Sequence, residues 1–191
     1  MTHDLPTDLL STTHAAGLGF EAYVATDPKR AADWMAIHER TTLTSGQRSL
    51  IEGFVRRINV IVVSGTWCGD CVQQGPLLAR IAEGSDLVDL RWVDRDEQSE
   101  LASRLRINGG NRVPVAVFMN EFFEPVSILG DRTLTRYRAI AARNLGPSCP
   151  LPGAPVPDAE LDATLQEWLD EFERVQLLLR LSPRLRAHHG D

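Results

Sequence analysis

A run of β-branched residues that ends just before a Cys-x-x-Cys motif is the feature that most restricts the fold of this sequence. Residues 59–64 read Asn-Val-Ile-Val-Val-Ser, which is typical of a strand covered on both faces. The motif Cys68-Gly69-Asp70-Cys71 follows, and apolar residues then recur at helical spacing. A buried strand that leads into a helix through a pair of cysteines indicates an α/β domain with its thiols at a helix N-terminus.

The remaining periodicity predicts further elements on both sides of this unit. Thr44-Ser45-Gly46-Gln47 is a capping-box pattern, which begins a helix. The first 26 residues are expected to be irregular and Arg184–His189 to be a frayed tail, while the arginines of the helix at 133–145 are expected to face solvent. In all, the sequence predicts helices over 27–38, 44–58, 71–83, 97–105, 133–145 and from 158 onward, and strands over 59–64, 88–93, 113–118 and 126–129.

Composition excludes several classes of function. The 191 residues, 43% of them apolar, are enough for one sizeable core. The formal net charge of -6 provides no basic field for nucleic acid or an anionic membrane surface. The first residues do not resemble a secretory signal, and no apolar run is long enough to cross a bilayer, so we expect a cytoplasmic protein. Three cysteines do not suit a disulfide scaffold, which favours a chemical role for the pair.

The spacing of the two cysteines predicts a different role for each. A thiol exchanges disulfides only as its thiolate. Cys68 is expected at the helix N-terminus, where unpaired amides and the helix dipole stabilise an anion, so it is the predicted nucleophile. Cys71, one turn further along, is expected to lie beneath Cys68 and to be the resolving thiol that releases a bound partner.

Four features in register resemble the thioredoxin family: Trp67 before the first cysteine, the two-residue spacer, Pro76 within the following helix, and Val113-Pro114 before a buried strand. The resemblance covers about 59–145. It implies a three-layer α/β/α sandwich with a mixed central sheet, here with N-terminal helices and a C-terminal helix added. It also implies a cis peptide bond before Pro114, and substrate binding by Trp67, Val113 and Pro114.

The family resemblance also implies how the reaction is supplied. No cofactor would be bound, because the redox group is the Cys68-Cys71 disulfide itself. Substrates would be disulfide-containing proteins or small molecules. Electrons would come from a separate reductase, which in this family is a flavoprotein using NADPH, or from a low-molecular-weight thiol.

Two positions depart from the family pattern. Typical thioredoxins carry a buried Asp that relays protons to the resolving thiol, where this chain has Val62. The spacer, typically Gly-Pro, is Gly69-Asp70 here. A carboxylate at Asp70 would raise the pKa of a nearby thiol and oppose the helix terminus, and it would alternatively serve as the base for Cys71.

Other functions remain open at this point. A Cys-x-x-Cys pair is also half of a zinc site, but a second ligand pair is not apparent among the remaining candidates, so no metal is expected. A thioredoxin-fold module for binding, chaperone-like action or redox sensing, without turnover, is the stronger alternative. The remaining metal-ligand candidates are Cys149, itself expected to be a surface thiol, and His3, His14, His38, His188 and His189.

The chain divides by composition into a core and appended segments. Residues 1–58 are predicted to be a helical extension packed on a thioredoxin-like domain at 59–146, and the Pro-rich residues 147–157 a stiff linker. Residues 158–191 are predicted to form an amphipathic helix and tail. Its apolar stripe is expected to pack on its own domain, with a homodimer as the alternative, and consists of Leu161, Leu165, Trp168, Phe172, Val175 and Leu179.

Overall fold

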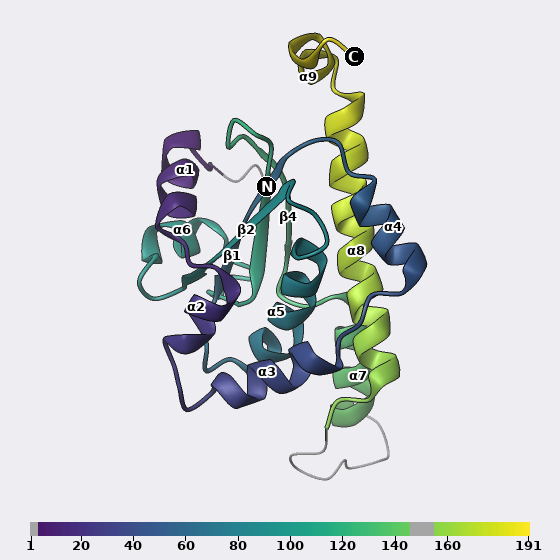
Figure 1. Cartoon of the computed structure of the whole chain (residues 1–191). Helices are drawn as coiled ribbons and strands as arrows, with labels where there is room; N and C mark the ends of the chain where they lie inside the picture. The colour runs from purple at the N-terminus through teal and green to yellow at the C-terminus, as the bar shows by residue number, and fades with distance from the viewer. Residues whose placement is uncertain (1–3, 146–154) are drawn as a thin grey trace.

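A mixed sheet in the order β2-β1-β3-β4 forms the centre of the structure, a computed structural model that describes residues 4–145 and 155–191 (Figure 1). β1 pairs with β2 in parallel and with β3 antiparallel, and β4 pairs antiparallel with β3. The strands are β1 (Ile58–Ser64), β2 (Val88–Asp94), β3 (Val115–Met119) and β4 (Pro125–Gly130). All four lie where the sequence predicts them, within two residues at either end.

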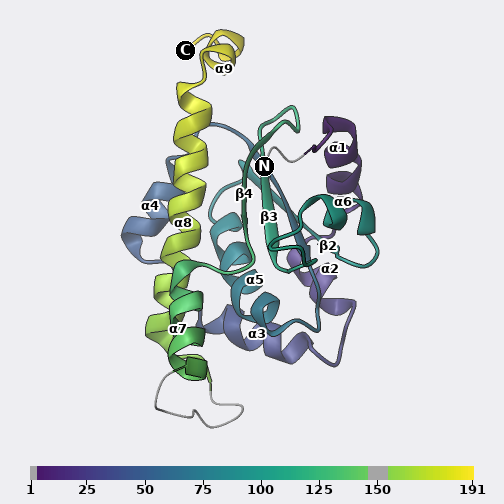
Figure 2. The same cartoon turned by 180° about the vertical axis from the view of Figure 1, so that it is seen from behind.

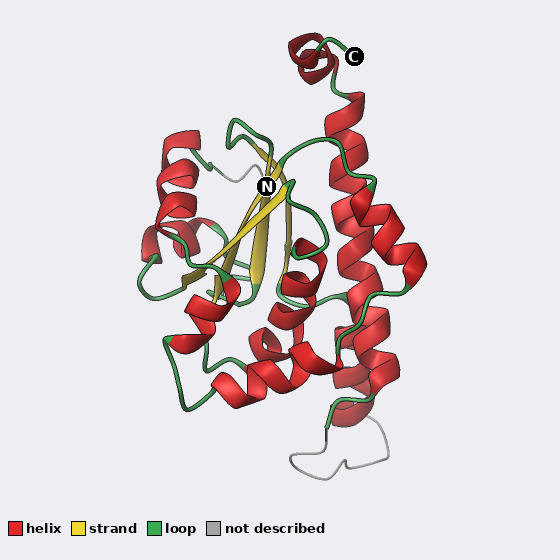
Figure 3. Ribbon diagram, viewed as in Figure 1, coloured by secondary structure: helices red, strands yellow, loops and turns green. Residues whose placement is uncertain are grey.

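Helices cover both faces of the sheet and complete three layers, as the fold prediction requires. α1 and α6 lie on one side, and α5 and α8 lie on the other (Figures 1 and 2). Figure 3 shows the strands enclosed between these helices. The helices are α1 (Thr7–Ala16), α2 (Phe20–Ala25), α3 (Ala31–Arg40), α4 (Ser45–Glu52), α5 (Gly69–Ala82), α6 (Ser99–Arg104), α7 (Leu134–Leu145), α8 (Asp158–Leu181) and α9 (Pro183–His189).

Every residue of β1 is buried, which explains why the strand is rich in β-branched apolar residues. The capping box at Thr44 is also present: the Thr44 hydroxyl accepts from the Gln47 amide, and the Gln47 side chain accepts from the Thr44 amide. That helix ends at Glu52 rather than at Ile58, which already belongs to β1. The capping box is predicted well from the sequence because its hydrogen bonds form between residues only three positions apart.

The prediction of an irregular N-terminus was wrong, since α1 and α2 occupy it. Both helices are short and neither has a side-chain cap, so tertiary packing rather than local sequence stabilises them. Leu18, between them, exchanges backbone hydrogen bonds with Trp92 of β2 (2.9 and 2.8 Å). The next predicted helix begins later than expected, at Ala31, because Asp27 caps a turn instead, with its carboxylate accepting from the Lys29 amide.

The C-terminal helix packs on its own chain. The predicted apolar stripe of α8 is buried, and Phe172 meets Phe118 of β3 edge to face, with ring centroids 5.0 Å apart. The prediction that the stripe packs on its own domain is therefore confirmed, and the stripe is not exposed to a partner chain. The prediction of a frayed tail at Arg184–His189 was wrong, because these residues belong to helix α9. Ser182 caps this helix, Pro183 is its first residue and Leu185 is buried.

Some predictions fall outside the described residues. Most of the proposed linker at 147–157, including Cys149, lies there. Within the described parts, none of the helices combines the length and apolar character needed to cross a membrane.

Candidate active site

The two cysteines occupy the start of α5, at the end of the sheet where β1 finishes. Cys68 is the residue that precedes the first turn, with extended backbone (φ -83°, ψ 121°), and its carbonyl accepts from the Val72 amide at 2.9 Å. Cys68 is half-buried, whereas Cys71 is fully buried beneath it. An accessible thiol above a shielded one is the arrangement that sequential attack on a disulfide requires.

The surroundings of the two thiols move their pKa values in opposite directions. The pKa of Cys68 is lowered to about 6, chiefly by the hydrogen bond from the Cys71 thiol and, against the effect of burial, by the amides of Cys71 and Asp70. Burial and the neighbouring Cys68 raise the pKa of Cys71 well above its usual range. At neutral pH, Cys68 is therefore a thiolate and Cys71 a thiol.

The N-terminal helices hold the loop that precedes the dithiol. The Trp34 indole on α3 donates to the Thr66 carbonyl at 3.1 Å, and the Thr66 hydroxyl donates to Asp27 at 3.2 Å. Gly75 on α5 permits this approach, because a Cβ there would lie 2.2 Å from the Trp34 ring. The extension thus belongs structurally to the site.

The residues expected to contact substrate surround Cys68. The Cys68 sulfur lies 3.6 Å from the Val113 carbonyl oxygen, within donating distance when Cys68 is protonated, and the Val113-Pro114 peptide bond is cis, as the family resemblance implies. Trp67 is 48% exposed, and the Arg95 guanidinium lies 4.7 Å above its ring. The structure therefore brings Trp67, Val113 and Pro114 to the dithiol.

The Asp70 carboxylate is hydrogen-bonded to two arginine side chains. It accepts from Arg132 Nε at 2.8 Å and from Arg136 Nη2 at 2.9 Å. Arg136 also contacts Glu160 of α8, which is paired with Arg143 at 3.0 Å. Both oxygens of the Asp70 carboxylate are therefore occupied by guanidinium donors, in charge-assisted hydrogen bonds. Its charge raises the pKa of Cys68, but by less than either hydrogen bond with Cys71 lowers it.

The expectation that the arginines of α7 face solvent was wrong for Arg136, which is buried. Helical periodicity treats an arginine as a surface residue, and only the fold reveals that Asp70 and Glu160 flank it. Gln74 makes a second link to α8: its side-chain oxygen accepts from the Trp168 indole (3.3 Å), while its amide donates to the Asp131 carbonyl (3.0 Å).

These pairings predict that Asp70→Asn affects stability more than thiol chemistry. We expect the pH midpoint of Cys68 alkylation to fall by less than about half a unit, because the charge removed is already compensated. The free energy of unfolding should fall by roughly 1–3 kcal/mol, since Arg136 loses a buried partner. Alkylation profiles and urea titrations measure the two effects.

The matched control for this prediction is Asp33→Asn, which breaks an exposed pair with Arg30. It should cost less than about 1 kcal/mol and leave the alkylation profile unchanged. A shift of a full pH unit or more in Asp70→Asn would contradict the compensated-charge account.

Among the residues that the structure describes, neither Cys68 nor Cys71 belongs to a cluster suited to a metal. Within residues 4–145 and 155–191, the one group of three potential ligands that could share an ion is Glu121 with His188 and His189, between the β3–β4 turn and α9. The His189 imidazole and Glu121 are already hydrogen-bonded at 2.8 Å. That contact accounts for their proximity.

Comparison with known proteins agrees with this geometry. A family model described as thioredoxin matches residues 17–140, and the chain therefore belongs to the thioredoxin family. The match begins before α2, so it includes part of the N-terminal extension. The comparison with curated proteins found no match.

Solved structures show the same fold at low sequence identity. A protein of unknown function from Pseudomonas aeruginosa is 17% identical, with a TM-score of 0.61, over 85% of this chain and 96% of that one. An HIV epitope-scaffold is 16% identical, also with a TM-score of 0.61, over 83% and 96% of the two chains. Both matches cover more of the chain than the 59–146 segment in which sequence motifs are recognisable, so the shared fold includes part of the added segments.

Proposed function

We propose that this protein is a thiol-disulfide oxidoreductase whose Cys68-Cys71 pair exchanges a disulfide with a protein or small-molecule substrate. The observation that carries the proposal is the opposed ionisation of the pair, an accessible thiol with a pKa of about 6 above a fully buried thiol. A binding module needs neither property. An exchange enzyme needs both the reactive outer thiolate and the shielded inner thiol. The outer sulfur attacks the substrate disulfide, and the inner sulfur reacts only after the mixed disulfide has formed.

The reaction proceeds in two exchanges. The Cys68 thiolate attacks a substrate disulfide, forms a mixed disulfide and displaces one substrate thiolate. Cys71 then loses its proton and attacks Cys68, which forms the intramolecular disulfide and releases the second substrate thiolate. The reverse sequence oxidises a substrate dithiol with the same residues.

Substrate recognition is proposed to be directed at the backbone. The Val113 carbonyl, 3.6 Å from the Cys68 sulfur, is available to an amide of an extended substrate segment. The exposed face of Trp67 provides apolar contact beside it. Such recognition tolerates many side chains, which suits a general disulfide substrate.

The supply of electrons is part of the proposal. A separate reductase or a low-molecular-weight thiol returns the disulfide to the dithiol, and no bound cofactor takes part. This chemistry fits a reducing compartment, and we propose the cytoplasm as its location. The net charge of -6 supports neither nucleic acid nor anionic membrane as a partner.

The test is catalysis of disulfide reduction by dithiothreitol, with a protein disulfide and a glutathione-peptide mixed disulfide as substrates. We expect catalytic amounts of the protein to accelerate reduction of at least one of them. If neither is reduced faster than in the uncatalysed reaction, the oxidoreductase proposal fails, and a binding or redox-sensing module becomes the better account.

A further inference from the structure

The proposed function requires a substrate segment to be held against Cys68, and the inference that follows rests on that function. The Val113 carbonyl oxygen lies 3.6 Å from the Cys68 sulfur, so a substrate amide that donates to this oxygen brings its neighbouring disulfide close to the attacking sulfur. Val113 and Cys68 belong to different parts of the chain, the residues just before β3 and the start of α5. Contacts between these two parts must therefore set the distance.

A buried carboxylate that the proposed exchange does not use lies between these two parts. Asp131 directly follows β4, and its side chain is only 3% exposed. Its Oδ2 accepts from Arg112 Nη1 at 3.2 Å and from Arg132 Nη1 at 3.3 Å, and its Oδ1 accepts from the Tyr137 hydroxyl. Burying a carboxylate is costly unless it is paired, and a carboxylate with three donors is held in one orientation. Asp131 therefore links the residues around it rigidly.

The two arginines extend from this carboxylate to the two sides of the site. Arg112 directly precedes Val113, so its contact with Asp131 restrains the segment that carries the Val113 carbonyl. On the other side, Arg132 Nε donates at 2.8 Å to Asp70, which lies between the two cysteines. Charge-assisted hydrogen bonds thus connect the Val113 segment to the cysteine motif. This arginine–aspartate bridge consists, in order, of Arg112, Asp131, Arg132 and Asp70.

Backbone contacts bring the same parts of the chain together. Gly130, which precedes Asp131, packs closely on the segment before β3, because a Cβ at Gly130 would lie 2.6 Å from the Pro114 carbonyl oxygen. The buried Gln74 amide of α5 donates to the carbonyl of Asp131 at 3.0 Å and to that of Asp70 at 3.4 Å. The end of β4 is therefore fixed both to the Pro114 segment and to the start of α5.

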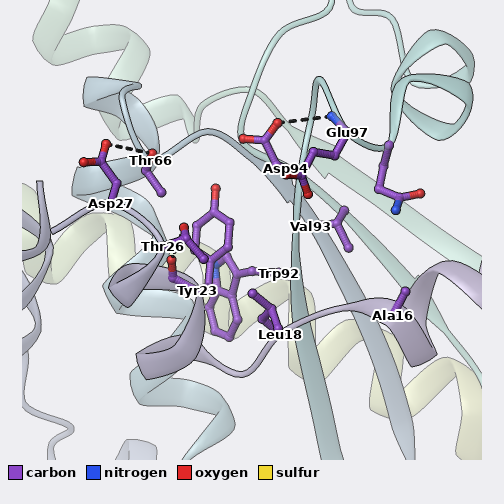
Figure 4. A pocket seen from close by; sticks show the side chains of 11 residues that line it. Ala16, Leu18, Tyr23, Thr26, Asp27, Thr66, Trp92, Val93, Asp94 and Glu97 are labelled. Atoms are coloured by element: carbon purple, nitrogen blue, oxygen red, sulfur yellow. Dashed lines mark hydrogen bonds between the residues drawn. The ribbon is translucent and has the colours of Figure 1, made fainter.

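The loop before the cysteines is fixed by a separate contact. Figure 4 shows the Thr66 hydroxyl bonded to Asp27, at 3.2 Å, at the wall of a pocket of about 480 Å³. The residues that line this pocket come from α1, α2, β2 and the loops beside them. The arginine–aspartate bridge thus adds a second restraint on the site, from β4 and the segment before β3 rather than from the N-terminal helices.

We propose that the arginine–aspartate bridge positions an extended substrate for attack by Cys68, by fixing the Val113 carbonyl relative to the Cys68 sulfur. Asp131, Arg112 and Arg132 are positioning residues and do not touch the reacting atoms. In the step that they support, the Cys68 thiolate forms a bond to one substrate sulfur, and the other substrate sulfur leaves with the electron pair of the broken disulfide. Misplacement of a reacting group by about 1 Å costs up to about a hundredfold in rate, so loss of the bridge has a measurable effect.

The test compares a substrate that has a peptide backbone with two reagents that lack one. Exchange with an extended peptide disulfide is measured beside exchange with hydroxyethyl disulfide and alkylation by N-ethylmaleimide. The variants are Arg112→Gln, Arg132→Gln and Asp131→Asn. Asp131→Asn alters a buried group, whereas the two arginine side chains are 40% and 24% exposed, so their variants leave the core intact. The matched control is Arg174→Gln, which removes an arginine paired with Glu171 of its own helix.

We expect each bridge variant to lower kcat/KM for the peptide disulfide by about tenfold or more, while hydroxyethyl disulfide and N-ethylmaleimide react at wild-type rates. A general defect of the fold would instead change all three rates together. The double variant Arg112→Gln/Arg132→Gln should be little slower than either single variant, because both arginines act through Asp131. Arg174→Gln should resemble the wild type with all three reagents.

Three results would overturn the positioning role, and a fourth would overturn the function. Wild-type rates with the peptide in both arginine variants, equal changes with all three reagents, or losses that multiply in the double variant would each remove the role and leave the oxidoreductase intact. If the wild type is alkylated by N-ethylmaleimide but exchanges with neither disulfide, the proposed function fails, and the positioning role fails with it.

Discussion

Cys68→Ser is expected to lower the rate of disulfide exchange by at least about a thousandfold, because a serine hydroxyl is essentially un-ionised at neutral pH and does not attack a disulfide. Cys71→Ser should behave differently. Its Cys68 still attacks, but no resolving thiol follows, so the substrate remains attached through a mixed disulfide. Its Cys68 should also have a higher pKa, since the Cys71 thiol is the main group that lowers it.

The measurement is intact mass after incubation with a peptide disulfide, together with turnover by dithiothreitol. The expected results are unmodified Cys68→Ser and a one-to-one peptide adduct of Cys71→Ser that dithiothreitol removes. Cys149→Ser should turn over like the wild type, which excludes the third thiol as the reacting group. An adduct on Cys68→Ser, or full turnover by Cys71→Ser, would contradict the assigned order of attack.

Trp168→Ala is expected to cost about 3–5 kcal/mol of unfolding free energy, the range for loss of a large buried aromatic residue. Trp168 is fully buried on α8, and its indole donates to Gln74 on α5. The variant therefore removes apolar contact and leaves a buried amide oxygen with one donor fewer. Urea titration of wild type and variant gives the difference directly.

The control for this prediction lies on the same helix. Leu181 is 74% exposed, so Leu181→Ala should change the unfolding free energy by less than about 0.5 kcal/mol. If Trp168→Ala is as stable as Leu181→Ala, α8 is an appendage rather than part of the core. The expected large difference would show that the thioredoxin-like unit and its C-terminal helix unfold together.

Structural features that depend on residues close together in the sequence could be predicted, whereas those that depend on distant residues could not. β1 and the Thr44 capping box are recognisable because strand composition and capping depend on neighbouring residues. The stripe of α8 is recognisable from its spacing, and an amphipathic face ordinarily packs on the nearest core. Such features define the fold.

The unpredicted features depend on residues that are distant in sequence. α1 and α2 are too short to be stable alone, so their pattern is weak and the fold stabilises them. Arg136 looks like a surface residue until Asp70 and Glu160, from α5 and α8, are placed around it. The position of the dithiol at the start of a helix was predictable, whereas the residues that support it were not.

The most direct test of the central claim is the reduction potential of the Cys68-Cys71 pair, measured by equilibration in defined glutathione or dithiothreitol buffers with free thiols counted by mass. We expect a single two-electron transition that is absent in Cys68→Ser. Because the low pKa of Cys68 stabilises the reduced form, the potential should lie above the value of about -270 mV for thioredoxin. If no intramolecular disulfide forms at any redox poise, the pair does not perform exchange and the account is wrong.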